Sequence, residues 1–427
     1  MAVKHILGFL AFALFLFSFH YFPEKKKAYI LAIVCLFPLM ELHITNDQMG
    51  MFTVFDGITY YVFLYFIKDF IYTIKYSKVY VMLFFALALT LVIGALQSEF
   101  MKSAFLNAIR YLSIFFYAKI LIDACLEDNR LAGTIVKCLK VVCLFSVLFL
   151  VMQLFVGLKF SFYPELNPNT QDNGMTRYPS FFFDAQVYAQ FLAMSVFFFL
   201  MTTQNEKANA INRIGFFALV IVIFLTGGRA GLMGLCAGLV IVFLSASNRF
   251  RFFTLAGGLV LFITISQFPE AFIVFNRDEG VNDSLNVRSQ IWKEAYQVFL
   301  NNPLWGTGIG EFQNNNIKHF NFRYYMLNDE PVYYGTESGY LNILAECGLI
   351  AFVLIFIIIS LPLISALRGY IRKEINHNIF FLIAGIFAWL TAFSTSNTLD
   401  DKRIVILLGT LLCLLITATK TKPLSHA

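Results

Sequence analysis

Three arginines beside apolar segments are the side chains in this sequence best suited to chemistry. Arg177 lies in RYPSFFFDAQVYAQ, Arg229 in TGGRAG and Arg288 in NVRSQIW. A guanidinium group keeps its charge and pairs with phosphate oxygens through a planar fork, so three converging arginines would suit the pyrophosphate of a lipid. The alternative for each arginine is that its long side chain only reaches the membrane interface.

Two carboxylates accompany the arginines in the stretch TESGYLNILAECGLIAF, which runs from Thr336 to Phe352. Thr336 is an N-cap type and would place Glu337 in the first turn of a helix, where the positive helix end favours a carboxylate. Position alone favours a stabilising surface role for Glu337. Glu346 lies nine residues further along, about 13 Å deeper. We expect it to hydrogen bond to another helix in a structural role.

The composition defines the elements that must position these side chains. Hydrophobic residues make up 59% of the chain and charged residues 14%, with a mean hydropathy of +0.71. We therefore predict an all-α polytopic membrane protein in which residues 1–427 form a single membrane domain. About thirteen apolar runs, within a range of about twelve to fourteen, are long enough to cross a bilayer. They are 5–22, 28–45, 52–67, 79–97, 104–124, 133–157, 186–203, 211–226, 230–247, 251–268, 339–366, 377–394 and 403–419.

The distribution of Lys and Arg over alternate loops predicts the orientation. Of the 32 Lys and Arg residues, 19 fall on the side that carries Lys25 and Lys420, and this side is expected to be cytoplasmic. The N-terminus and both long loops, 158–185 and 269–338, are then outside, and the C-terminus is inside. This topology explains the net charge of +6, which gives no reason to expect nucleic acid as a partner.

The longer outer loop precedes the third-last helix and contains an expected amphipathic helix. Apolar residues recur at helical spacing between Asp283 or Ser284, both good N-cap types, and a stop at 301–303. The pattern predicts a helix near 284–300 that carries Arg288 and lies on the membrane surface or caps the outer vestibule. A purely structural lid is the alternative.

Two glycine-rich segments adjoin the apolar runs. The three glycines of PLWGTGIGEF, residues 303–312, follow no strand and no βαβ unit, so they are not a dinucleotide fingerprint and instead predict tight turns. The segment TGGRAG lacks the Lys-Ser/Thr ending of a phosphate loop. With the glycines that follow it as far as 238, it predicts a hairpin turn and then a closely packed small-residue helix face.

Cysteine and histidine residues predict no site. The seven cysteines lie in or beside apolar runs without metal-ligand spacing, and the six histidines are scattered. We therefore expect no metal site, no cofactor and no disulfide framework.

Five motifs between residues 170 and 360 follow one another in a recognisable order. They are an Arg before an aromatic, Asp-bearing segment that opens a helix (Arg177 to Ala189), a Gly-Arg-Ala/Gly turn (Gly228 to Gly231), Arg-x-x-x-Trp (Arg288 to Trp292), Pro-Leu-x-Gly-x-Gly-x-Gly-x-Phe (Pro303 to Phe312), and a form of His-Asn/Ser-x-x-Leu-x-x-Leu-x-Glu-x-Gly (Glu337 to Gly348). Their order and spacing resemble the bacterial O-antigen polymerase (Wzy) and O-antigen ligase (WaaL) superfamily.

This resemblance implies a membrane glycosyltransferase with a GT-C-like fold that needs no metal and works at the periplasmic face of the bacterial inner membrane. Donor and acceptor would be oligosaccharides linked to undecaprenyl pyrophosphate, held beside membrane lipid, with a chain-length regulator protein as a candidate partner. A hydroxyl of the acceptor attacks the donor sugar, usually with inversion, as the lipid pyrophosphate departs. Such a site needs cations for the departing group and a base near the attacking hydroxyl.

The residues that match the motifs take up these roles by resemblance. Arg177 and Arg288 would hold the pyrophosphate, with Arg229 in support. Asp184 and Tyr340 are further candidate substrate-binding residues in the same motifs.

Glu337 is the candidate base, which would orient or deprotonate the acceptor hydroxyl. Ligases of this superfamily typically have His at this position, which is the natural base near neutral pH. The Glu favours a polymerase of surface polysaccharide such as O-antigen. A ligase that transfers finished glycan to lipid A core or to protein is the alternative. A flippase for the same lipids is the alternative from a different class, and inverted repeats with broken helices at the midplane would favour it.

Overall fold

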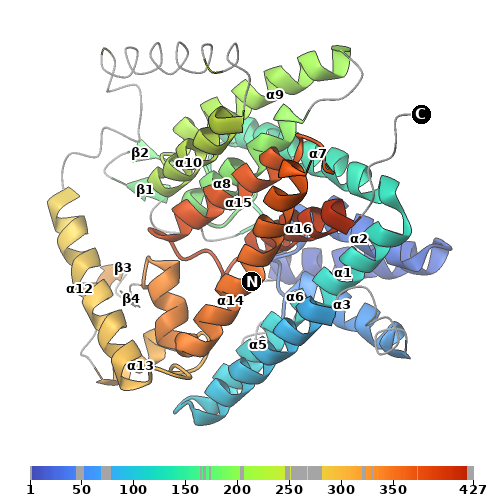
Figure 1. Cartoon of the computed structure of the whole chain (residues 1–427). Coiled ribbons are helices and arrows are strands. Elements are labelled where there is room, and N and C mark those ends of the chain that lie inside the picture. The colour runs from blue at the N-terminus through green and yellow to red at the C-terminus, as the bar shows by residue number, and fades with distance from the viewer. Residues whose placement is uncertain are drawn as a thin grey trace.

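The computed structural model describes residues 2–44, 52–68, 78–163, 166, 170–172, 175–201, 206–245, 251, 267, 281–319, 324–327, 330–333, 335–372 and 374–420. Figure 1 shows a bundle of crossing helices. In the described ranges, the strands form two short antiparallel hairpins, β1 (Gln171–Asp172) with β2 (Met175–Thr176) and β3 (Tyr324–Leu327) with β4 (Glu330–Tyr333). The predicted helical membrane class is thus confirmed, with two small hairpins that the sequence analysis did not foresee.

Six helices within the described ranges are long and apolar enough to cross a membrane. They are α5 (Lys78–Gln97), α6 (Met101–Glu127), α7 (Asn129–Val156), α9 (Glu206–Leu225), α14 (Gly339–Ile371) and α16 (Lys402–Lys420). The shorter helices are α1 (Ala2–Tyr21), α2 (Lys25–Cys35), η1 (Phe37–Leu39), α3 (Val54–Tyr65), α8 (Ala185–Ser195), η5 (Val196–Leu200), α10 (Arg229–Ser245), α12 (Val281–Asn301), α13 (Phe312–His319) and α15 (Ile379–Phe393). The long helices define a multi-pass membrane protein.

The predicted apolar runs coincide with helices, with two corrections and one exception. The run 28–45 is not one helix, because α2 ends at Cys35 and a 3-10 turn with Pro38 at its start follows. Proline has no backbone N–H for the continuing α-helix. The run 186–203 likewise changes from α8 to the 3-10 helix η5. The run 251–268 lies outside the described residues except for its first residue and one more.

Local capping explains where several helices begin. Thr53 and Asp56 form a capping box at α3, in which each side chain accepts a hydrogen bond from the other residue's backbone N–H. Asp128 caps α7 through the N–H of Arg130. Asp184 caps α8 by accepting from the N–H of Gln186 at 2.7 Å.

The small-residue face predicted along 231–238 is confirmed. Gly234 of α10 lies against the backbone of Ala388 in α15, and Gly231 lies against the backbone of Ala189 in α8. A β-carbon at either glycine would come within 3 Å of these backbone atoms. Small residues therefore let α10 pack closely against two neighbouring helices.

The two ends of α6 meet different parts of the chain. At its last turns, Glu127 pairs with Lys26 at 2.6 Å, in the segments predicted to be cytoplasmic. At its first turns, Asn107 donates to the carbonyl of Ile309 at 3.2 Å. Segments assigned by charge to one side of the membrane thus gather at one end of the helix bundle.

The amphipathic helix predicted at 284–300 is present as α12, which lies beside the start of α14 in Figure 1. Its buried face, formed by Ile291, Ala295 and Val298, packs with Phe312 and Ala345 in a small hydrophobic cluster. The helix already includes the two residues predicted as its N-cap, so that capping assignment was wrong. The cluster holds α12 against the first turns of α14.

Candidate functional site

The two polar stretches near the end of the chain interlock. Helix α14 is interrupted at Gly348, whose φ of 74° is left-handed. The segment 303–310 fills the interruption with its own backbone, because Thr307 N donates to Ala345 O at 3.0 Å and Gly308 N to Glu346 O at 2.9 Å. Leu349 N returns a bond to Pro303 O at 2.8 Å. The backbone groups exposed by the break are thereby satisfied without water.

Glycine is required on both sides of this interlock. Gly306 has a φ of +72°, and a β-carbon there would lie 2.3 Å from the carbonyl of Glu346. A β-carbon on Gly348 would lie 2.3 Å from the carbonyl of Leu304. The tight turns predicted for the glycines of 303–312 are confirmed. Glycine is also needed here because it allows the two backbones to approach closely.

The Glu346 side chain completes the interlock. Its Oε2 accepts from Gly310 N at 2.9 Å and from Asn342 Nδ2 at 3.1 Å, and its Oε1 accepts from Phe312 N at 3.2 Å. Phe312 is the first residue of α13, so this carboxylate caps that helix. The sequence analysis predicted a structural hydrogen bond to another helix, and the structure provides one through backbone amides.

Glu337 lies just before α14 rather than in its first turn. The helix begins at Gly339 with Ser338 as the N-cap, and Thr336 instead donates its hydroxyl to Asn342. The assignment of Thr336 as the N-cap was therefore wrong. Glu337 itself has a left-handed φ of 49°, which is uncommon for a residue with a β-carbon and marks a locally strained position.

The side chain of Glu337 pairs with Arg288 of α12. Arg288 Nε lies 2.5 Å from Glu337 Oε2, and the two side chains are 29% and 32% exposed. The pair is thus accessible to a ligand yet partly shielded from water. The two residues of this pair are 49 positions apart in the sequence.

Arg177, Asp184 and Arg229 form a second charged group. The Arg177 side chain is 3% exposed, and its Nε donates to the carbonyl of Thr226 at 3.1 Å, at the turn before α10. Burial has the largest effect on Arg177 and lowers its pKa. The nearby Asp184 opposes this shift, and Arg229 adds to it. Burial raises the pKa of Asp184, whereas its bond from Gln186 N–H and the nearby Arg177 lower it.

The end of α15 relates the starts of α10 and α14 to each other. Gly339 lies directly against the ring of Phe393. Helices α10 and α15 run antiparallel, with Gly234 beside Ala388. Arg229 lies five residues before Gly234 and Phe393 lies five residues after Ala388, so the two positions are at the same level along the helix pair. The fold therefore brings the start of α10 and the start of α14 to the same end of the bundle.

Tyr340 supports this junction. Its hydroxyl donates to the carbonyl of Leu390 at 2.7 Å, and its ring meets that of Phe393 edge-on with centroids 5.1 Å apart. The structure thus gives Tyr340 a contact with α15, and its role in substrate binding stays a prediction.

Charged residues at the start of α16 were missed in the sequence analysis. Lys402, only 2% exposed, donates to Arg110 O at 2.7 Å and lies 3.2 Å from the carboxylate of Asp56. Asp56 is fully buried and also accepts from Ser113 at 2.6 Å. The signal was present as the run DDKR between the last two apolar runs, and as an aspartate in the run 52–67.

Arg403, at the start of α16, connects that helix to the segment before α8. Its guanidinium bonds both oxygens of Asp401, at 2.9 and 2.6 Å, and donates to Phe181 O at 2.8 Å. It also lies 4.1 Å from the ring centroid of Phe182. Asp401 in turn raises the pKa of Asp184, so this bidentate pair contributes to the field around the arginine group.

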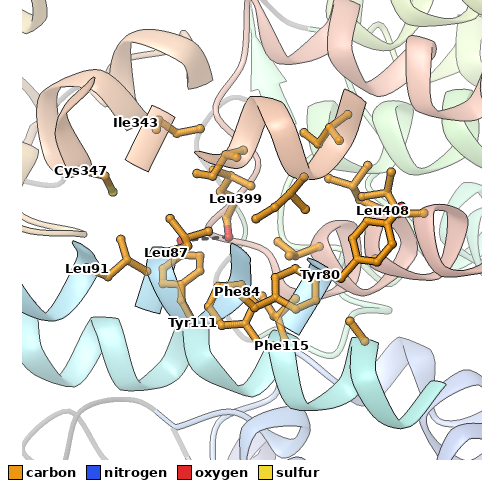
Figure 2. Close-up of a pocket in the computed structure, with 18 of the residues that line it drawn as sticks. Tyr80, Phe84, Leu87, Leu91, Tyr111, Phe115, Ile343, Cys347, Leu399 and Leu408 are labelled. Carbon is orange, nitrogen blue, oxygen red and sulfur yellow. Dashed lines mark hydrogen bonds between the residues drawn. The ribbon is translucent and has the colours of Figure 1, made fainter. Parts of the chain in front are cut away.

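An apolar cavity of about 150 Å³ lies next to Glu346, between α5, α6, α14 and α16. Figure 2 shows the rings of Tyr80, Phe84, Tyr111 and Phe115 along one wall, with the Tyr111 hydroxyl bonded to Leu399 O at 3.1 Å. Asn342 also lines it. Its composition suits hydrocarbon rather than a polar ligand.

Within the described ranges, no three His, Cys, Asp or Glu side chains gather to hold a metal ion. The charged groups of the site are instead arginines and carboxylates in close pairs.

The fold and site together define a multi-pass membrane protein with a charged site, braced by a glycine segment, at one end of its helix bundle. Residues 214–356 match the family model described as O-antigen ligase. The teichuronic acid biosynthesis protein TuaE of Bacillus subtilis (strain 168) is 27% identical over 238 residues, or 52% of this chain. The match spans 47% of that relative, about half its length. These comparisons confirm the resemblance to the superfamily.

Proposed function

We propose that this protein is a surface polysaccharide polymerase that joins oligosaccharide repeat units carried on undecaprenyl pyrophosphate at the periplasmic face of the inner membrane. The contact between Arg288 and Glu337 carries the proposal. It joins a phosphate-binding cation to a carboxylate base at 2.5 Å. Both residues lie in the stretch that matches the O-antigen ligase family, 214–356.

The reaction follows from the chemistry of these groups. An acceptor hydroxyl attacks the anomeric carbon of the donor sugar, the bond from that carbon to the pyrophosphate oxygen breaks, and the hydroxyl proton passes to Glu337. Arg288 binds the departing pyrophosphate together with Arg177 and Arg229, whose positive charges stabilise the anion. The nearby Asp184 raises the pKa of Arg177 and so favours the charged guanidinium.

The rest of the site supports this assignment. The interlock with segment 303–310 fixes the first turns of α14, which follow Glu337 directly, and α12 presents Arg288. Fixed groups stabilise a transition state better than mobile ones, because they need no reorganisation during the reaction. The apolar cavity beside Glu346 offers space for part of the hydrocarbon carrier. A chain-length regulator remains a candidate partner.

A ligase is the second candidate, and the description of the matching family model favours it. It would use the same donor site and transfer a finished glycan to a different acceptor. Transport of the lipid-linked sugar is disfavoured, because the break in α14 is filled by the chain's own backbone at segment 303–310 rather than left open to a solute.

The test is the size profile of surface glycan from a deletion strain that receives the wild-type gene, Glu337→Ala or Glu374→Ala. Glu374 is an exposed glutamate beyond the far end of α14 and serves as the matched control. A polymerase predicts single-repeat glycan in the deletion strain, a restored ladder with wild type and Glu374→Ala, and loss of the ladder with Glu337→Ala. Long chains that persist on the lipid carrier but never reach their final acceptor would identify a ligase. A normal ladder from normally expressed Glu337→Ala would refute the role of the base.

A further inference from the structure

A polar pocket of about 510 Å³ lies away from the charged site, between the turn after α5, the end of α12 and α13. Four carboxamides line it, from Gln97, Asn301, Asn302 and Asn315. We call it the carboxamide pocket. Its volume falls within the range of about 300 to 1,000 Å³ that is usual for small-molecule sites.

The side chains of these four residues make no hydrogen bond to any part of the chain that the structure describes. Asn301, Asn302 and Asn315 lie close together in sequence, on the two sides of segment 303–310, whereas Gln97 comes from the distant end of α5. The segment packs against the residues that follow Gln97, because Gly308 lies against Ser98. Thr307 of that segment also lines the pocket. The convergence of donor and acceptor groups is therefore a result of the tertiary fold.

The charges around the pocket are compensated. Glu99, which also lines it, accepts at Oε2 from Lys318 at 2.8 Å and from His319 at 2.9 Å. These contacts, with that from Lys318 the largest, lower the pKa of Glu99. Because Lys318 is already paired with this carboxylate, the pocket is poorly suited to a phosphate. Its polar lining is equally unsuited to a hydrocarbon chain.

A carboxamide carries two donors and an acceptor with two lone pairs, in one plane. Sugar hydroxyls and acetamido groups both donate and accept, so they complement such a lining. A sugar with the wrong arrangement would leave polar groups unpaired, which gives the site specificity.

We propose that the carboxamide pocket binds uncharged sugar residues of the glycan substrate at a distance from the reacting end. Asn301 and Arg288 lie thirteen residues apart on α12, or about 20 Å along the helix. The sugar in the pocket is therefore not the sugar that reacts. This assignment rests on the proposed function, because it takes the ligand to be the glycan that the charged site extends.

The test measures binding of short, lipid-free oligosaccharides released by mild acid from the surface glycan of the producing strain. Purified full-length protein is titrated by calorimetry, as wild type, as Asn301→Ala/Asn315→Ala, and as Leu300→Ala/Ile317→Ala. Leu300 and Ile317 are exposed on the same two helices but do not line the pocket, so the last variant is the control.

Loss of two carboxamides is expected to weaken binding by about tenfold or more, and the control to bind as wild type does. In cells, the pocket variant should shift the glycan to shorter chains. Equal binding by the pocket variant and wild type, or no binding by wild type, would overturn the assignment. Gln97→Ala, at the last residue of α5, repeats the test with a weaker effect should the double variant fail to fold.

The outcome separates this inference from the polymerase proposal. Glu337→Ala should retain oligosaccharide binding while it loses chain extension, because its side chain pairs with Arg288, about 20 Å along α12 from Asn301. If binding depends on the carboxamides but deletion of the gene leaves chain length unchanged, the pocket stands and the polymerase assignment fails.

Discussion

Replacing Gly306 with alanine should break the interlock between segment 303–310 and α14. An added β-carbon would lie 2.3 Å from the Glu346 carbonyl and 2.5 Å from the backbone nitrogen of Cys347, and neither backbone atom can move without moving the helix. The left-handed φ of +72° costs alanine about 1 kcal/mol. Separating the two backbones also removes three hydrogen bonds that contribute about 1 kcal/mol each. We expect Gly306→Ala to lower the free energy of unfolding by about 4 kcal/mol.

The measurement is a denaturant titration of purified protein in mixed micelles, beside Gly133→Ala as the control. Gly133 lies inside α7 without a left-handed φ, and a β-carbon added there would meet nothing within 4 Å, so alanine should be neutral or slightly stabilising. A Gly306→Ala protein whose unfolding free energy lies within about 1 kcal/mol of the wild type would refute the reasoning. It would mean that the segment can shift without losing its bonds to α14.

Three further substitutions test the site. Asp56→Asn should destabilise the protein by about 3 to 5 kcal/mol in the same titration, because Lys402 then loses a buried carboxylate partner; a change below about 1 kcal/mol would contradict this. Glu346→Gln should leave the protein folded but increase hydrogen exchange in α13, because an amide accepts more weakly than a carboxylate; unchanged exchange would contradict the capping role. Arg288→Lys should reduce chain extension at normal expression, because an ammonium cannot form the planar fork; a full-length ladder would refute that role.

The sequence by itself determined the membrane class and the positions of the long helices. Hydropathy indicates how favourably each segment enters lipid, and this depends on the segment's own residues rather than on its neighbours in the fold. The amphipathic pattern around Arg288 similarly predicted α12, and the small residues along 231–238 predicted close packing. These features are periodic, and periodic patterns can be read one segment at a time.

Only the tertiary structure decided how the polar groups meet. Glu337 was expected in a first helical turn, but a left-handed backbone places it before α14 and against Arg288. The break at Gly348 could not be foreseen, because the bonds that stabilise it come from segment 303–310. The burial of Lys402 among partners from other helices was equally hidden. In each case the stabilising partner is distant in sequence, so the conformational preferences of the local segment do not predict the contact.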